Sequence, residues 1–93
     1  MRDFVGKAAF ITGGASGIGL GISKALLSEG MNVVIGDVNA AHMASAADEL
    51  AASNVVFVHV DVTDRASVAA AATAAITAFG PIHVLCHNAG IAG

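Results

Sequence analysis

Several residue types are scarce or missing in this sequence of 93 residues. It contains no tryptophan and no tyrosine, one proline, and a single cysteine, Cys86. One cysteine cannot form an internal disulfide, which excludes a small secreted scaffold held together by such bonds. The first residues also offer no convincing signal-peptide core. These absences predict a cytoplasmic protein.

Basic residues are scarce as well. Four Lys or Arg residues stand against seven Asp or Glu, for a net charge of −3. The sequence therefore has no basic face for nucleic acid and no cationic helix for an anionic membrane. Although 56% of the residues are hydrophobic, no segment approaches the roughly 20 strongly apolar residues that cross a bilayer. We expect neither nucleic acid nor a membrane as a partner.

The residues that are present alternate between two kinds of segment. Short runs rich in β-branched residues indicate strands, and longer runs with apolar residues at helical spacing indicate helices. The predicted strands are residues 8–12, 32–36, 55–60 and 83–86. The predicted helices are residues 17–29, 40–52 and 64–79. Strands that alternate with helices in this way predict a parallel sheet with helices on both faces.

The ends and faces of the predicted helices can also be read from the sequence. Gly30 and Gly80 suit the ends of the first and third helices, and Thr63 or Asp64 suits the start of the third. The apolar side expected in the first helix comprises Ile18, Ile22, Ala25 and Leu26. The stripe expected in the third helix, as ordinary core, comprises Val68, Ala72, Ala75, Ile76 and Phe79.

Right-handed crossovers between these elements give the strand order 3-2-1-4. The first two helices then cover one face of the sheet, and the third covers part of the other. The last strand, 83–86, is left at an edge, apolar and carrying neither lysine nor a bulge. Such an edge invites pairing with another strand. We expect the partner to come from the rest of a longer chain, with a homo-oligomer as the alternative.

A glycine-rich stretch, TGGASGIG at residues 12–19, links the first strand to the first helix. The free amides at a helix N-terminus and the helix dipole bind anions, and glycine lets a phosphate approach the backbone closely. The stretch is not a P-loop, because no Lys-Ser/Thr pair follows its glycines. It is not the GxGxxG pattern in register either. The alternative is that the glycines only form a tight turn and a close helix–strand contact.

An acid, Asp37, ends the second predicted strand, 18 positions after Gly19. This is near the spacing at which a carboxylate meets the ribose of an adenine dinucleotide. A 2′-phosphate there would face this negative charge, and neither Val38 nor Ala15 offers a cation to offset it. The pattern therefore favours NAD over NADP. The alternative role for Asp37 is an ordinary acid at a strand end.

Two later motifs follow the third and fourth strands. Asp61 opens the sequence DVTD and lies too early to cap the third helix, so we expect it to be free to meet the edge of a base. The sequence HNAG at residues 87–90 follows the last strand. Asn and Gly are common in any turn, so this second motif is informative only because it follows the earlier motifs in the right order along the chain.

With these motifs in order, the sequence resembles the short-chain dehydrogenase/reductase family, whose TGxxxGxG signature it matches at every fixed position. The resemblance implies a Rossmann-type fold in which the loop from Gly13 to Gly19 holds a pyrophosphate. It also implies which part of the cofactor each residue contacts. The loop binds the pyrophosphate, later residues bind the ribose and base of the adenosine, and the last ones lie beneath the ribose on the nicotinamide side. The implied cofactor-binding residues are Gly13, Ser16, Gly17, Ile18, Gly19, Asp37, Asp61, Val62, Asn88, Ala89 and Gly90.

The implied activity is NAD(H)-dependent interconversion of an alcohol and a carbonyl compound. The family's catalytic Ser and Tyr-x-x-x-Lys have no match here, and the sequence contains no tyrosine. Residues 1–93 are thus expected to be the N-terminal NAD-binding portion of one Rossmann-type domain, with no catalytic residue and no activity unless completed. The alternative is an inactive nucleotide-binding or assembly half-domain. One departure is His87, where the family usually has Asn.

Cys86, with His83 and His87 nearby, raises the alternative of a metal site or a thiol nucleophile. Histidines four residues apart suit zinc when they lie on a helix. On a strand they lie about 13 Å apart, and Cys86 faces away from His87. We therefore expect no metal, and Cys86 as a small buried apolar residue.

Overall fold

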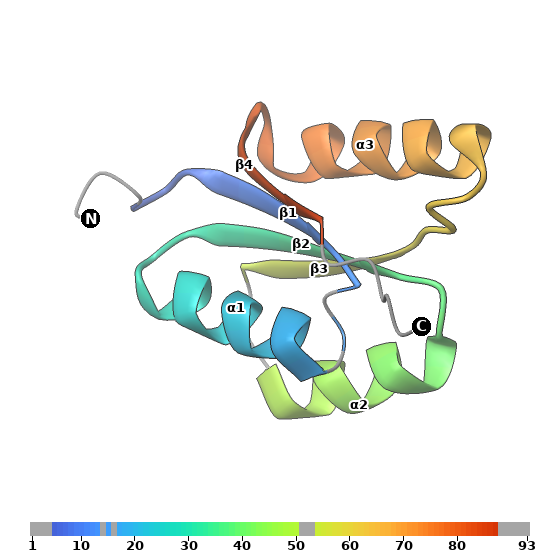
Figure 1. Ribbon diagram of the computed structural model, residues 1–93. Helices are drawn as coiled ribbons and strands as arrows, with labels where there is room; N and C mark the ends of the chain where they lie inside the picture. The colour runs from blue at the N-terminus through green and yellow to red at the C-terminus, as the bar shows by residue number, and fades with distance from the viewer. Residues whose placement is uncertain (1–4, 14, 16, 51–53, 88–93) are drawn as a thin grey trace.

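The computed structural model describes residues 5–13, 15, 17–50 and 54–87 (Figure 1). Its elements follow the predicted order, and no described end differs from the prediction by more than one residue. The strands are β1 (Ala8–Thr12), β2 (Asn32–Asp37), β3 (Val55–His59) and β4 (Ile82–His87). The helices are α1 (Gly17–Ser28), α2 (Ala40–Leu50) and α3 (Arg65–Phe79). The predicted end of the second helix, at residue 52, lies outside the described residues.

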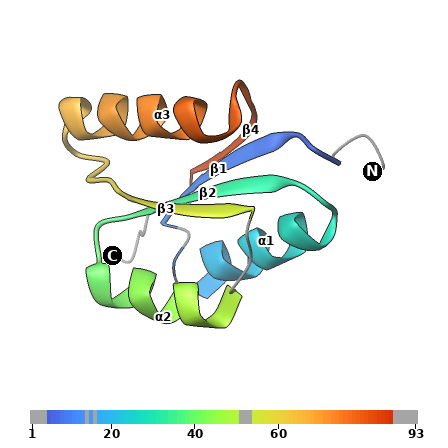
Figure 2. The same ribbon diagram turned by 180° about the vertical axis from the view of Figure 1, so that it is seen from behind.

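The four strands form one parallel sheet in the order β3-β2-β1-β4, as predicted. Figures 1 and 2 show α1 and α2 together on one face and α3 on the other. This placement confirms three layers and follows from right-handed connections between parallel strands. None of the helices in the described ranges is long and apolar enough to span a bilayer.

The two central strands, β1 and β2, are covered on both faces, which explains their nearly continuous apolar sequences. Alternate side chains of each strand enter different cores. The core toward α1 and α2 includes Ala9, Ile11, Met31, Val33, Ile35 and Ala46. The core toward α3 includes Phe10, Val34, Val60, Ala71 and Ala75.

The apolar side expected for helix α1 is correct only in part, because Ile22 and Leu26 pack against the core but the fully buried positions are small residues. Gly19 and Ser23 are its buried residues. Ile18, by contrast, is 75% exposed. The buried Ser23 hydroxyl is satisfied because it donates to the carbonyl of Gly19 at 2.9 Å. Small side chains allow a close approach to the sheet, and Ile22 packs at the margin of this contact.

Helix α3 is capped as the sequence indicates but is only partly buried. Of the two candidate caps, Asp64 is the one used, since its side chain accepts from the amides of Ala66 and Ser67. At the other end of α3, the amide of Gly80 donates to the carbonyl of Ile76 at 2.7 Å.

The apolar stripe expected to be core in α3 is therefore correct only in part. Ala75 is fully buried, and Ala72 and Phe79 pack at the margin of the core. Val68 and Ile76 remain 37% and 53% exposed. The reason is that α3 covers only part of its face of the sheet, and these two side chains overhang the uncovered part.

Strand β4 contains an irregularity that the sequence analysis excluded. Ala8 pairs with Ile82 but Ala9 pairs with Val84, so the register shifts by one residue at His83. The His83 ring takes part in the ladder, because its Nδ1 accepts from the amide of Ala8 at 3.4 Å. The extra residue makes a bulge, which locally disrupts the ladder on the side toward β1. Cys86 packs, partly buried, against the core beneath α1.

Candidate functional site

The carboxyl ends of β1, β2 and β3 meet at one edge of the sheet because the strands are parallel. Thr12 at the end of β1 is in register with Gly36, and Asp37 at the end of β2 is in register with His59 of β3. The connections that leave this edge carry the glycine-rich stretch and Asp61. In parallel α/β sheets, ligands bind at this edge, so the topology brings the predicted motifs to the expected place.

The loop after β1 is fixed to the neighbouring strand. The amide of Gly13 donates to the carbonyl of Gly36 at 2.7 Å. Gly13 and Gly17 have φ of 68° and 57°, a conformation that side chains other than glycine rarely adopt. A Cβ built on Gly17 would meet nothing within 4 Å, so the space over the start of α1 is open. Gly14 and Ser16 lie outside the described residues.

Asp37 is the best-anchored charged residue at this edge. Its side chain is held between two backbone amides, with Oδ2 accepting from Ala15 at 3.2 Å and Oδ1 from Asn39 at 3.1 Å. Its own carbonyl accepts from the amide of Val60 at 3.0 Å. The residue is only 9% exposed. A fixed carboxylate therefore lies directly against the glycine-rich loop.

Gly36 also shapes this edge and was missed in the sequence. A Cβ built there would lie 2.6 Å from Val60 Cγ1 and 2.9 Å from Phe10 Cε1, too close for any side chain. The available signal was a glycine as the last residue of the predicted strand 32–36, since glycine in a strand often marks a close approach. Gly36 lets the α3-side core close directly beneath Asp37.

Asp61 is less free than the sequence suggested. Its Oδ1 accepts from the Thr63 amide at 3.0 Å and from the Thr63 hydroxyl at 2.6 Å. Its amide donates to the Ser67 hydroxyl at 2.9 Å. The Thr63 side chain, and then its amide, hold the pKa of Asp61 below its ordinary value. One carboxylate oxygen thus forms a local turn, which corrects the expectation of an unengaged side chain.

Exposed apolar side chains lie at the same edge of the sheet. Ile18 in the first turn of α1, Val38 after β2 and Val62 after β3 are 75%, 59% and 43% exposed. Apolar surface of this kind suits the flat face of a base. Val38 was not among the predicted site residues, and its signal was its position next to Asp37. Asn88, Ala89 and Gly90, which were predicted, lie outside the described residues.

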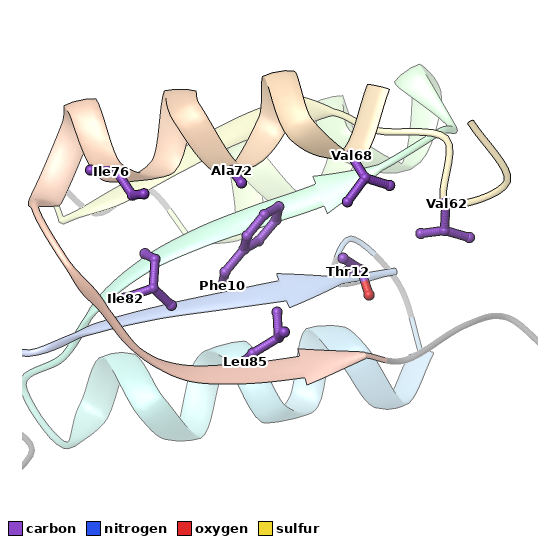
Figure 3. A pocket seen from close by; sticks show the side chains of 8 residues that line it. All are labelled: Phe10, Thr12, Val62, Val68, Ala72, Ile76, Ile82 and Leu85. Atoms are coloured by element: carbon purple, nitrogen blue, oxygen red, sulfur yellow. The ribbon is translucent and has the colours of Figure 1, made fainter. Parts of the chain in front are cut away.

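A groove of about 500 Å³ opens between α3 and the edge strand β4, and it reaches the carboxyl edge of the sheet at Thr12 and Val62 (Figure 3). Its lining is apolar apart from the hydroxyl of Thr12. The lining residues are Phe10, Thr12, Val62, Val68, Ala72, Ile76, Ile82 and Leu85. These side chains carry no ionisable group that could serve as an acid or a base. Within the described ranges, no three His, Cys, Asp or Glu residues are grouped so that they could hold a metal ion.

The residues at the carboxyl edge fit a dinucleotide. The N-terminus of α1 suits a pyrophosphate, and a Cβ on Gly17 would meet nothing within 4 Å, so none of the described residues blocks that position. Asp37 retains acceptor capacity for ribose hydroxyls beside that loop. The strand order, the glycine-rich turn after β1 and the acid ending β2 together define a Rossmann-type dinucleotide-binding fold.

Comparison with known proteins identifies the family within that class. Residues 7–93 match the family model described as short chain dehydrogenase, and the chain belongs to this family. It is 42% identical over 92 residues to momilactone A synthase from Oryza sativa subsp. japonica, covering 99% of this chain and 34% of that one. It is 45% identical over 87 residues to the 3-alpha-(or 20-beta)-hydroxysteroid dehydrogenase of Mycobacterium tuberculosis, covering 94% and 33%.

Solved structures agree. A short-chain dehydrogenase/reductase from Burkholderia phymatum, solved in complex with NAD, superposes with a TM-score of 0.84 at 40% identity. That match covers 91% of this chain and 31% of the other. The chain thus spans about a third of the length of the relatives it matches.

Proposed function

We propose that residues 1–93 form the NAD(H)-binding part of an oxidoreductase that interconverts an alcohol and a carbonyl compound. The observation that carries the proposal is the Asp37 carboxylate, held 3.2 Å from the Ala15 amide of the glycine-rich loop. An acceptor for ribose hydroxyls and donors for a pyrophosphate thereby lie side by side. When bound, the nicotinamide supplies the hydride chemistry.

The proposed contacts divide the cofactor among the strand ends. The loop from Gly13 to Gly19, with Ser16 and Ile18, takes the pyrophosphate, and Asp37 takes the adenosine ribose. Asp61 and Val62 contact the adenine, and Asp61 uses the carboxylate oxygen that does not accept from Thr63. Asn88, Ala89 and Gly90 form the floor beneath the nicotinamide ribose. Proton transfer is assigned to a Ser and a Tyr-x-x-x-Lys outside this sequence.

The preference for NAD over NADP rests on charge. A 2′-phosphate on the adenosine ribose would meet the negative charge of the Asp37 carboxylate, which accepts hydrogen bonds from two backbone amides. The next residue, Val38, is apolar and offers no compensating cation. The relative from Burkholderia phymatum, solved in complex with NAD, supports this proposal.

A fluorescence titration with NADH and NADPH tests the proposal. The unmodified chain is expected to bind NADH more tightly than NADPH. Asp37→Ala is expected to weaken NADH binding about tenfold or more, because a hydrogen bond to a charged acceptor contributes about 1.5–3 kcal/mol. Asp48→Ala, an exposed acid of α2, is the matched control and should leave the NADH affinity unchanged.

Two results would contradict the proposal. Equal binding of NADH and NADPH by the unmodified chain would remove the preference for NAD. A gene that encodes no Ser and Tyr-x-x-x-Lys after these residues would favour a nucleotide-binding or assembly half-domain without catalysis.

A further inference from the structure

We propose that Asp37 is a positioning residue that holds the glycine-rich loop in its binding conformation before any cofactor arrives. This inference rests on the proposed function and deepens it. Its basis is that the carboxylate accepts from the loop amide of Ala15 in the chain alone. The same side chain would therefore organise the pyrophosphate site and contact the ribose, coupling the two parts of the cofactor site.

The two roles do not compete for the same oxygen lone pairs. An ionised carboxylate offers about four acceptor sites, two on each oxygen. Ala15 uses one on Oδ2 and Asn39 uses one on Oδ1. One site on each oxygen remains for the two hydroxyls of a ribose. The carboxylate can thus keep the loop in place while it binds the sugar.

The loop depends on this contact because its anchors converge on the end of β2. Gly13 is bonded to the carbonyl of Gly36, and Ala15 to the side chain of Asp37, the next residue. Ala15 itself is 3% exposed. Its amide would lose a charged acceptor in a buried setting if Asp37 were replaced, which is costly. The loop would then sample conformations in which its amides diverge.

If Asp37 holds the loop in place, replacing it should weaken the binding even of a ligand that cannot contact its carboxylate. When only a fraction of molecules has the competent loop, the apparent affinity falls by that fraction. A nucleotide without ribose hydroxyls still needs the loop for its diphosphate. It therefore separates the positioning role of Asp37 from its direct contact with the sugar.

The first measurement is amide hydrogen exchange in the chain without nucleotide. In Asp37→Ala, the Ala15 amide is expected to exchange about tenfold faster or more, the factor that corresponds to losing a bond to a charged acceptor. The Val33 amide, bonded to the Asn54 carbonyl at 2.9 Å, reports general loosening of the sheet. Its exchange should change much less. Equal acceleration at both amides, or none at Ala15, would overturn the inference.

The second measurement compares ADP with 2′,3′-dideoxy-ADP by calorimetry. Asp37→Ala is expected to weaken dideoxy-ADP about fivefold or more and ADP further, whereas Asp48→Ala, which removes an equal charge from α2, should not weaken either. If Asp37→Ala weakens ADP alone, Asp37 acts only as a ribose contact and the positioning role is wrong. If the unmodified chain binds neither nucleotide, the proposed function fails, and the exchange of Ala15 alone decides whether Asp37 holds the loop.

Discussion

Gly36 occupies a point in β2 where the α3-side core leaves no room for a side chain. A methyl group there would press on Val60 and on the Phe10 ring, both of which belong to the α3-side core. We predict that Gly36→Ala lowers the free energy of unfolding by about 1–3 kcal/mol, the usual cost of forcing an extra carbon into a packed core. Urea denaturation measures the change.

Gly21 provides the matched control for that substitution. It lies in α1, is exposed, and a Cβ built on it meets nothing within 4 Å. Gly21→Ala should therefore raise the free energy of unfolding by about 0.5–1 kcal/mol, because alanine is the better helix former. If the free energy of unfolding changed in the same direction and by a similar amount in both variants, lack of space would not be the reason for glycine at position 36.

Asp61 gives a prediction that depends on pH. The Thr63 hydroxyl is the first cause of its lowered pKa, so Thr63→Val, which keeps the shape but removes the donor, should raise the Asp61 pKa toward its ordinary value. The interaction favours the folded state above the unfolded pKa of about 3.9 and is lost as the pH falls through the lower folded value. A carboxyl titration followed by NMR measures the shift.

The same substitution elsewhere checks the assignment. Thr73 is an exposed residue of α3. Thr73→Val should leave the Asp61 pKa where it is in the unmodified chain. An Asp61 pKa that does not respond to Thr63→Val would mean that the local turn does not form in solution.

At the level of elements, the start of α3 depends on one side chain. Asp64 accepts from the amides of Ala66 at 3.0 Å and Ser67 at 3.4 Å. Asp64→Ala should cost about 0.5–2 kcal/mol of stability, the usual effect of losing an N-cap. Thermal or urea unfolding tests this, with Asp48→Ala in α2 as a control expected to stay within about 0.5 kcal/mol. A loss no larger than that of the control would contradict the capping role.

The elements were predictable because each leaves a local pattern. Continuous apolar runs marked β1 and β2, and glycines with positive φ ended α1 and α3 at Gly30 and Gly80. The buried face of α1 was only partly predictable from apolar periodicity. Ile22 and Leu26 pack against the core as predicted, but the fully buried positions are Gly19 and Ser23, small residues that hydropathy does not rank as core. The bulge at His83 depends on how two distant strands meet.

The candidate site shows the same division. The glycine-rich stretch and Asp37 were found because a turn, a helix start and an acid at fixed spacing have a physical meaning in sequence alone. The hydrogen bond from Ala15 to Asp37 spans 22 positions, so no local pattern contains it. Gly36 and the turn at Asp61 likewise depend on neighbours that only the folded chain supplies.

The whole molecule carries an apolar groove that its described elements do not cover. Leu85 of β4, which projects into this groove, is 70% exposed (Figure 3). Exposed patches of this kind bind hydrophobic dyes and promote association. We predict that Leu85→Lys lowers the fluorescence of bound ANS severalfold and reduces turbidity on concentration, with the far-UV CD spectrum unchanged.

The Leu85→Lys variant needs a control at an exposed residue outside the groove. Val38→Lys adds the same charge to a residue that is 59% exposed and does not line the groove. It should leave most of the dye signal in place. Equal loss of signal in both variants would attribute the effect to net charge and not to the groove.

The strand order also determines when each strand can pair while the chain is synthesised from its N-terminus on the ribosome. Ala8 of the central strand is matched with Ile82, 74 positions later. Translation must therefore deliver nearly all of these residues before the last strand can dock, and until then one flank of β1 has no neighbour. Contacts this distant along the chain form slowly, so the nascent polypeptide passes through a stage in which β1, whose five residues are all buried in the folded chain, is paired along one side only.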